Sequence, residues 1–195
     1  MIAIVNYGVG NLKSIKKAVE KFDRAVVTRD AEEIKAADGI ILPGVGAFPA
    51  AIKNLTDLKD VIVKAKVPVL GICLGMQLFA EVSEEGGINE GLKIIRGRVV
   101  KFPESVGKIP HMGWNVVKNE DHEIFEGIKD QYFYFVHSYY FKAEEGIIAT
   151  TDYGIEFPSA VAKNNFIGVQ FHPEKSGKVG LKLIENFVEI CKQNP

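Results

Sequence analysis

The chain has 195 residues, of which 47% are hydrophobic and 25% are charged, the composition of an ordinary globular protein. Its 24 Lys and Arg nearly balance 25 Asp and Glu, and no long block of like charge indicates binding to nucleic acid or a membrane surface. Two cysteines, Cys73 and Cys191, are too few for a disulfide framework. No segment reads as a signal peptide or a membrane span, so we expect a cytoplasmic protein.

Short apolar runs alternate with helical patterns in the first part of the chain. Strands are expected at residues 2–5, 25–28, 39–42 and 67–72. Helices are expected at residues 12–22, after Asp30 as an N-cap, and at residues 50–55, 58–65 and 74–82. This alternation predicts a mostly parallel sheet with helices on both faces, because parallel strands buried on both sides are continuously apolar.

The second half of the chain changes character, with short alternating runs separated by turn residues. Further strands are expected at residues 99–102, 132–136, 147–151, 159–163 and 167–170, followed by a final helix at 179–191. The predicted fold class is therefore α/β: three layers, with a mostly parallel central sheet flanked by helices and antiparallel strands inserted in the second half. No repeat or linker divides the chain, which predicts a single domain over residues 1–195.

The segment GICLGMQ at residues 71–77 places Cys73 between an apolar strand and a helix. In a nucleophile elbow the central residue lies on a sharp turn, and glycines two positions away remove side chains that would collide there. Cys73 is therefore the candidate nucleophile. A free cysteine is more often a small buried apolar residue, and Cys191, on an amphipathic helix without glycine or histidine neighbours, fits that structural interpretation.

A thiol nucleophile needs a base, and the base needs an orienting acceptor. GVQFHPE at residues 168–174 supplies His172 and Glu174. In extended backbone the two side chains point to the same side, so we expect the carboxylate to accept from Nδ1–H of His172. By itself, a His-Pro-Glu sequence is more typical of an exposed histidine beside a surface glutamate; together with the cysteine elbow it predicts a Cys-His-Glu triad.

Acyl transfer also needs donors for the developing oxyanion. The backbone N–H of Leu74, directly after the nucleophile, is one candidate. The second is the PGVG turn, where Gly44 and Gly46 allow the peptide planes around Val45 to rotate at low steric cost. An ordinary turn is the alternative interpretation.

The other three histidines have no obvious carboxylate partner. His111 and His122 lie in polar, turn-rich stretches, whereas His137 ends an aromatic strand and could line the site. No group of His, Cys, Asp and Glu has the spacing of metal ligands. We expect neither a metal nor a cofactor.

GICLGMQ and GVQFHPE, in this order and about a hundred residues apart, resemble the triad-type class I glutamine amidotransferase domains. Those domains hydrolyse glutamine to glutamate and pass the ammonia to a synthase. Further segments are similar to the glutaminase subunits of imidazole glycerol phosphate synthases: NYGVGN (6–11), PGVGAF (43–48), PHMGWN (110–115), YFVHSY (134–139) and HPEKS (172–176). The resemblance extends over essentially the whole chain.

This resemblance implies roles for residues that the sequence pattern alone does not assign. Gln77 and the backbone of His137, Ser138 and Tyr139 would hold the glutamine substrate. Residues facing a partner would be Asn11, Trp114, Asn115 and Lys175. The implied partner is a cyclase subunit with a (β/α)8 barrel that forms a heterodimer with this chain and uses the ammonia in histidine biosynthesis.

Three alternatives stay open at this point. The same chemistry could serve another synthase, such as GMP synthetase, anthranilate synthase or pyridoxal phosphate synthase. The chain could be a stand-alone hydrolase or peptidase of the same fold. It could also be a non-catalytic binding module, although an intact Cys73, His172 and Glu174 argues against that.

Overall fold

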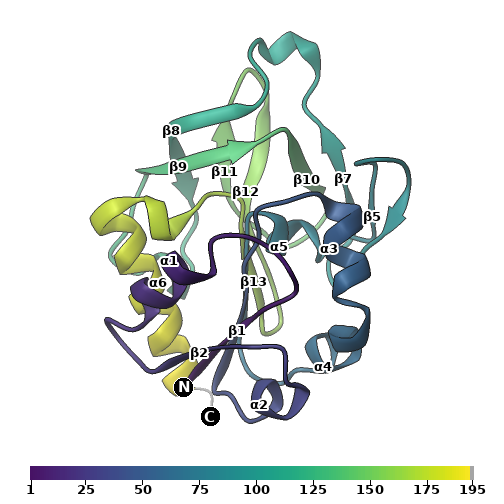
Figure 1. Cartoon of the computed structure of the whole chain (residues 1–195). Helices are drawn as coiled ribbons and strands as arrows, with labels where there is room; N and C mark the ends of the chain where they lie inside the picture. The colour runs from purple at the N-terminus through teal and green to yellow at the C-terminus, as the bar shows by residue number, and fades with distance from the viewer. Residues whose placement is uncertain (194–195) are drawn as a thin grey trace.

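The computed structural model describes residues 1–193 and contains one large mixed sheet (Figure 1). Its parallel part consists, in spatial order, of β2 (Ala25–Thr28), β1 (Ile2–Val5), β3 (Gly39–Leu42), β4 (Val69–Ile72) and β13 (Phe166–Val169). Its antiparallel part continues with β12 (Glu156–Lys163), β11 (Ile147–Asp152), β8 (His111–Asn119) and β9 (Gln131–His137). The predicted α/β fold class, parallel core and added antiparallel strands are therefore confirmed.

A smaller sheet lies beside the second half of the large one. Its order is β10 (Tyr139–Ala143), β7 (Gly97–Lys101), β5 (Val82–Ser83) and β6 (Asn89–Glu90). Only one residue, Ser138, separates β9 from β10, so the chain passes from the large sheet to the small one at this point. The change of sheet brings the backbone of residues 137–139 over the carboxyl ends of the parallel strands (Figure 1).

Helices cover both faces of the parallel strands (Figure 1). One face carries α1 (Leu12–Val19) and α6 (Gly177–Gln193). The other carries α2 (Ala31–Lys35), α3 (Phe48–Asn54), α4 (Lys59–Val63) and α5 (Leu74–Gln77). Short 3₁₀ turns complete the described elements: η1 (Thr56–Leu58), η2 (Glu104–Val106), η3 (Glu123–Phe125) and η4 (Pro173–Lys175). None of the described helices combines the length and apolar character that crossing a bilayer requires.

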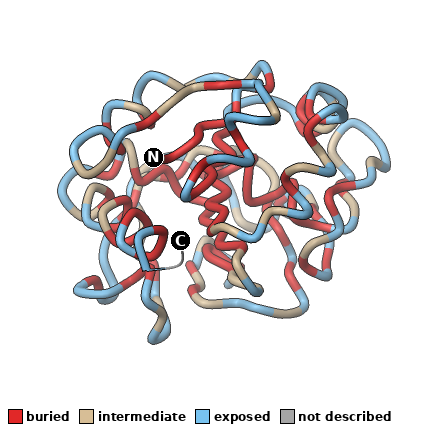
Figure 2. Tube along the Cα trace, turned by 90° about the horizontal axis from the view of Figure 1, so that it is seen from below, coloured by how far each residue is buried: buried red, intermediate tan, exposed pale blue. Residues whose placement is uncertain are grey.

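Alternation along the strands divides the interior into two cores. Ile2 and Ile4 of β1 pack into the core beneath α1 and α6, whereas Ala3 and Val5 face α2, α3 and α4. Successive strand residues point to opposite faces, so a strand covered by helices on both sides must be apolar throughout. The buried residues gather in the middle of the molecule and the exposed ones in the peripheral turns (Figure 2).

Several predicted boundaries are wrong. The helix expected at 74–82 ends at Gln77, because the carbonyls of Leu78 and Phe79 accept hydrogen bonds from the N–H groups of Leu92 and Ile94, at 2.8 and 2.9 Å. The first helix ends at residue 19 rather than 22. The strands β8 and β10, and the very short β5 and β6, were not predicted. His111 was expected in a turn-rich stretch, but β8 begins at this residue and pairs with β9 over most of its length.

Candidate active site

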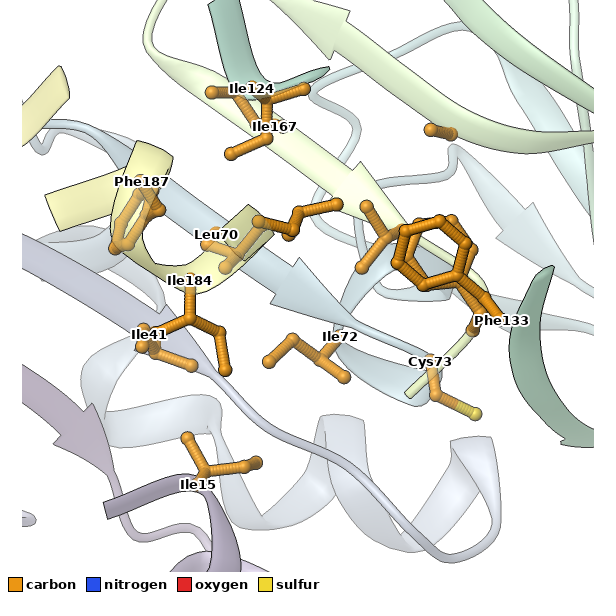
Figure 3. Packing of buried hydrophobic residues seen from close by; sticks show 14 of the residues in the cluster. Ile15, Ile41, Leu70, Ile72, Cys73, Ile124, Phe133, Ile167, Ile184 and Phe187 are labelled. Carbon is orange, nitrogen blue, oxygen red and sulfur yellow. The ribbon is translucent and has the colours of Figure 1, made fainter. Parts of the chain in front are cut away.

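Cys73 joins β4 to α5 in a conformation that non-glycine residues rarely adopt, with φ 53° and ψ −107°. Such a conformation costs about 1–3 kcal/mol and persists only where the surroundings enforce it. Here the N–H of Cys73 donates to the carbonyl of Val169 at 2.7 Å, and its carbonyl accepts from the N–H of Gln77 at 3.2 Å. The side chain lies at the carboxyl end of the strand that carries Leu70 and Ile72 (Figure 3).

The glycines on either side of Cys73 have no room for a side chain. A Cβ on Gly75 would lie 1.9 Å from the carbonyl oxygen of Leu42, and a Cβ on Gly71 would lie 2.7 Å from the carbonyl of Gly75. Both contacts are with backbone atoms, which cannot move aside as a flexible side chain can. The crowding that the G-x-C-x-G pattern predicted is therefore present in the structure.

His172 and Glu174 meet as expected, although the backbone between them is not extended. Nδ1 of His172 lies 2.8 Å from Oε1 of Glu174, and both side chains are 0% exposed. His172 itself is extended, but Pro173 opens the 3₁₀ turn η4, so the argument from extended backbone was wrong. The turn is held by Ser176, whose Oγ donates to the carbonyl of His172 at 2.6 Å. Pro173 lies at the first helical position, where its missing N–H costs nothing.

The environment of His172 favours the imidazolium form. Glu174 accepts from Nδ1, while the buried Nε2 makes no hydrogen bond of regular geometry within residues 1–193 and interacts with Cys73. Burial lowers the pKa of His172, but the charge of Cys73 and a hydrogen bond to its sulfur, followed by the hydrogen bond and charge of Glu174, outweigh burial and raise the pKa to about 10. At neutral pH the arrangement therefore holds His172 as an imidazolium beside the sulfur of Cys73.

A pocket of about 240 Å³ opens beside Cys73 and His172. Its lining consists of Gly44, Val45, Gly46, Cys73, Leu74, Gln77, Glu85, Val136, His137, Ser138, Tyr139 and His172. A larger hollow of about 730 Å³ lies along residues 119–129, away from Cys73, and no cysteine, serine or threonine lines it. The smaller pocket is therefore the candidate site. All of the oxyanion and substrate-binding residues that the sequence analysis named contribute to its lining.

The PGVG loop packs directly against the nucleophile turn. A Cβ on Gly44 would lie 2.5 Å from Cβ of Leu74, so glycine allows the two segments to approach. The carbonyl of Val45 accepts a hydrogen bond from the N–H of Gly10 at 3.3 Å, and the Val45 side chain is 45% exposed. The two candidate sources of oxyanion donors therefore lie next to each other at the pocket.

Gln77 and the segment 137–139 are joined by hydrogen bonds. Nε2 of Gln77 donates to the carbonyl of Tyr139 at 3.0 Å, and Nδ1–H of His137 donates to the same oxygen at 2.7 Å. The carbonyl of Ser138 accepts from the N–H of Phe102 at 3.1 Å. This wall of the pocket is therefore connected both to the end of β7 and to the helix that follows Cys73.

His111 is a buried strand residue rather than part of a polar turn. Its Nδ1 lies 2.9 Å from Nε2 of His137, and its Nε2 lies 3.2 Å from Nδ2 of Asn115. Since Asn115 donates, His111 carries its proton on Nδ1, and both rings are neutral. Burial lowers the pKa of His111 to about 4 and that of His137 to about 3. Within the described residues, no group of three His, Cys, Asp or Glu side chains is placed to bind a metal ion.

The residues expected at a partner face lie at the same end of the sheet as the pocket. Trp114 is 56% exposed on β8 and packs edge-on against Tyr134, whose ring lies 6.0 Å from Nζ of the exposed Lys175. Asn115 is turned inward, with Nδ2 also donating to the carbonyl of Asp152 at 2.8 Å. Asn11 donates to Oε1 of Glu174 and so contacts the triad carboxylate.

Comparison with known proteins identifies the family. Residues 3–191 match the model of "Glutamine amidotransferase class-I". The chain is 60% identical to the "Imidazole glycerol phosphate synthase subunit HisH" of Archaeoglobus fulgidus, with 99% of this chain and 100% of that protein aligned. It is 56% identical to the HisH subunit of Methanocaldococcus jannaschii, over 97% of this chain and 100% of that protein. The chain belongs to the class-I glutamine amidotransferase family.

Solved structures show the same fold at low sequence identity. A crystal structure of a glutamine amidotransferase has a TM-score of 0.78 and 18% identity, over 98% of this amidotransferase chain and 100% of that one. A glutamine amidotransferase from Thermotoga maritima has a TM-score of 0.63 and 19% identity, over 98% of this chain and 84% of that one. At these identities the likeness extends to the fold alone.

Sequence reasoning missed two polar residues of the amidotransferase site. Glu85 contributes a carboxylate to the pocket lining, and its Oε2 accepts from the N–H of Phe48 at 3.1 Å. Gln170 is fully buried behind the pocket, with Nε2 lying 3.5 Å from Sγ of Cys73. Gln170 stood inside a motif already singled out, so its position two residues before His172 was a usable signal. Glu85 lies in a polar turn with no comparable signal.

Proposed function

We propose that this chain is the glutaminase subunit of an imidazole glycerol phosphate synthase, which hydrolyses glutamine and supplies ammonia for histidine biosynthesis. The observation that carries the chemistry is the buried His172, oriented by Glu174 and with Nε2 interacting with Cys73. The near full-length identity to HisH subunits favours this synthase over the others considered. The proposal also treats residues 1–195 as a single cytoplasmic domain.

The first half of the reaction forms an acyl-enzyme. The Cys73 thiolate attacks the side-chain amide carbon of glutamine, a C–S bond forms, and the carbonyl electron pair moves to oxygen. N–H groups of Leu74 and of the Val45 loop stabilise the oxyanion. The His172 imidazolium then gives its Nε2 proton to the amide nitrogen, the C–N bond breaks, and ammonia leaves a thioester on Cys73.

The second half regenerates the enzyme. His172, now neutral, takes a proton from water, and the hydroxide attacks the thioester carbon. The C–S bond breaks, glutamate is released, and the thiolate–imidazolium pair is restored. Throughout, Glu174 fixes the proton on Nδ1 and stabilises the imidazolium.

The pocket fits the two ends of a glutamine molecule. Cys73 marks the place of the side-chain amide, whereas the carboxylate of Glu85 suits the α-ammonium group. Both N–H groups of the Gln77 amide donate hydrogen bonds within the protein, one to the carbonyl of Tyr139 and one to Oε1 of Gln170. Only its carbonyl oxygen is left to contact the substrate, which assigns Gln77 the role of an acceptor.

We further propose that the partner is a cyclase subunit with a (β/α)8 barrel and that the two chains form a heterodimer. Three apolar side chains on β8 and β9 support a docking face at the pocket end: Met112 (59% exposed), Trp114 (56%) and Tyr132 (59%). Interfaces are enriched in such aromatic and methionine side chains. Lys175, near the Tyr134 ring on which Trp114 packs, and Asn11, hydrogen-bonded to Glu174, complete the proposed contact. Ammonia released in water would be largely protonated, so a receiver at the pocket mouth has a chemical rationale.

The experiment is to measure glutamate release by the purified chain, first alone and then with the cyclase of imidazole glycerol phosphate synthase and the nucleotide ligand of that cyclase. We expect the rate to rise in the complex and imidazole glycerol phosphate to form from glutamine. Full activity without a partner would favour a stand-alone hydrolase. Stimulation by a different synthase, with none by the cyclase, would contradict the proposed partner.

A further inference from the structure

Gln170 lies directly behind the nucleophile, between β13 and His172. Its side chain is 0% exposed, and its backbone N–H donates to the carbonyl of Ser159 at 2.9 Å. Its Nε2 lies 3.5 Å from Sγ of Cys73, and its Oε1 lies 3.0 Å from Nε2 of Gln77. The catalytic steps described for Cys73 and His172 use none of these contacts.

The direction of these hydrogen bonds follows from the carbonyl of Tyr139. A carbonyl oxygen can only accept, so Gln77 must present its NH₂ group to it, at 3.0 Å. The NH₂ group of Gln77 can only donate, so Gln170 must present Oε1 to Gln77. The NH₂ group of Gln170 is then left facing the sulfur. The orientation of both amides is thereby assigned by the network.

His137 also donates to the carbonyl oxygen of Tyr139, the acceptor at which this chain of hydrogen bonds begins. Its Nδ1–H donates to the carbonyl of Tyr139 at 2.7 Å, so both lone pairs of that oxygen are occupied. A flip of Gln77 would place an acceptor against the carbonyl of Tyr139, and a flip of Gln170 would place a donor against the NH₂ group of Gln77. Either flip costs the full desolvation of an unpaired buried group. The N–H aimed at Cys73 is therefore a fixed feature of the fold.

We propose that Gln170 is a catalytic residue that stabilises the Cys73 thiolate by donating a hydrogen bond to its sulfur. Gln170 is not part of the pocket lining, so it contacts the sulfur from within the protein and leaves the pocket side for the substrate. Hydrogen bonds to ionised acceptors are about twice as strong as neutral ones. The same side chain also connects the nucleophile to Gln77. The proposal rests on Cys73 being the nucleophile of the proposed glutaminase.

Other charged or titratable groups act on Cys73 as well. His172 is the main partner, with Glu174 and His137 acting through it. Tyr7, after β1, is fully buried, and burial followed by the thiolate charge raises its pKa. Its hydroxyl donates to the carbonyl of Pro43, so it stays neutral. A test must therefore change Gln170 while leaving these groups in place.

The test is alkylation of Cys73 by iodoacetamide in the full-length chain. The rate is followed from pH 5 to pH 10 by mass spectrometry of the Cys73 and Cys191 peptides. In Gln170→Met, which keeps the size but removes the donor, we expect the pH of half-maximal rate to rise by about one unit. At pH values well below both midpoints we expect the alkylation to slow by about tenfold, the same shift expressed as a rate. The exposed Gln193→Met is the matched control and leaves both values unchanged.

Gln170→Glu is the second variant. It keeps the acceptor for Gln77 but brings a carboxylate to the sulfur, and we expect a rise of at least the same size. A folded variant of either kind whose half-maximal pH stays within about 0.3 unit of the native chain overturns the proposal. Failure of both variants to fold would make Gln170 a structural residue and overturns it too. Glutamine hydrolysis by the native complex is measured separately, so failure of the proposed function is distinguishable.

Discussion

Asn11 donates a hydrogen bond from Nδ2 to Oε1 of Glu174, the oxygen that Nδ1 of His172 also contacts at 2.8 Å. Asn11 has φ 76° and ψ 7°, the left-handed conformation that asparagine tolerates better than most residues. The loop after β1 thereby reaches a carboxylate that follows β13, although β3 and β4 lie between these strands in the sheet. A residue expected at the partner face thus also contacts the triad.

Asn11→Ala removes one of the two donors to this carboxylate. We expect kcat for glutamine to fall about tenfold, because a hydrogen bond to a charged group typically contributes about 1.5–3 kcal/mol. Affinity for the cyclase subunit, measured in parallel by calorimetry, separates this role from docking. Weaker partner binding with an unchanged kcat in the saturated complex would show that Asn11 serves only the interface.

Cys73→Ala should abolish glutamine hydrolysis while the fold is kept, because the change is local and removes the proposed nucleophile. Cys191→Ala should leave the activity nearly unchanged, since Cys191 lies buried against Gly39 at the far end of α6. Both variants are assayed for glutamate release in the complex. Activity that survives in Cys73→Ala but not in Cys191→Ala would contradict the assignment.

His172→Ala should lower kcat for glutamine at least about a hundredfold, the usual contribution of a general acid–base. With ammonia supplied in place of glutamine, cyclase turnover of the complex should stay at the native level. This comparison is the control, because a loss of both activities would point to disrupted assembly rather than lost proton transfer.

Gly75→Ala should destabilise the protein by at least about 2 kcal/mol, because its Cβ would lie 1.9 Å from the carbonyl oxygen of Leu42. Gly10→Ala is the control: its Cβ would meet Val45 at an ordinary 3.7 Å, and we expect a change within about 0.5 kcal/mol. Urea unfolding measures both free energies. Equal stabilities for the two variants would refute the packing argument.

The free energy of unfolding should fall as the pH falls below about 6.5. Burial lowers the pKa of His137 to about 3 and of His111 to about 4, so between these values and 6.5 the unfolded chain binds more protons than the folded one. The two histidines therefore make their full contribution to the free energy of unfolding above pH 6.5. By pH 4.5, His137 alone lowers that free energy by about 3 kcal/mol. Urea unfolding from pH 7.5 to 4.5 checks this; an identical slope in His137→Gln would contradict it.

Local patterns were sufficient for much of the fold and of the site. The apolar runs at residues 2–5 and 39–42 coincide with β1 and β3, because strands buried on both faces carry their signal in every residue. The glycines around Cys73 marked a crowded turn that the structure contains. The contact of His172 with Glu174 was anticipated too, although through the wrong backbone geometry.

The errors arose where distant segments decide the outcome. The helix after Cys73 stops early because N–H groups of residues 92–94 donate hydrogen bonds to the carbonyls with which the helix would continue. The strand β8 forms because β9 pairs with it, despite Gly113 and Asn115 within the strand. Neither partner is visible from the local sequence. Tertiary contacts override weak local preferences in both cases.

The sequence by itself determined which residues carry chemistry, because a nucleophile on a tight turn and a histidine beside a carboxylate are local arrangements. Only the tertiary structure decided what surrounds them. The contacts of Gln170 with Cys73, of Glu85 with Phe48 and of Asn11 with Glu174 join residues 97, 37 and 163 positions apart in the chain. Such contacts depend on strand order and on the direction of buried hydrogen bonds, which no single stretch of sequence specifies.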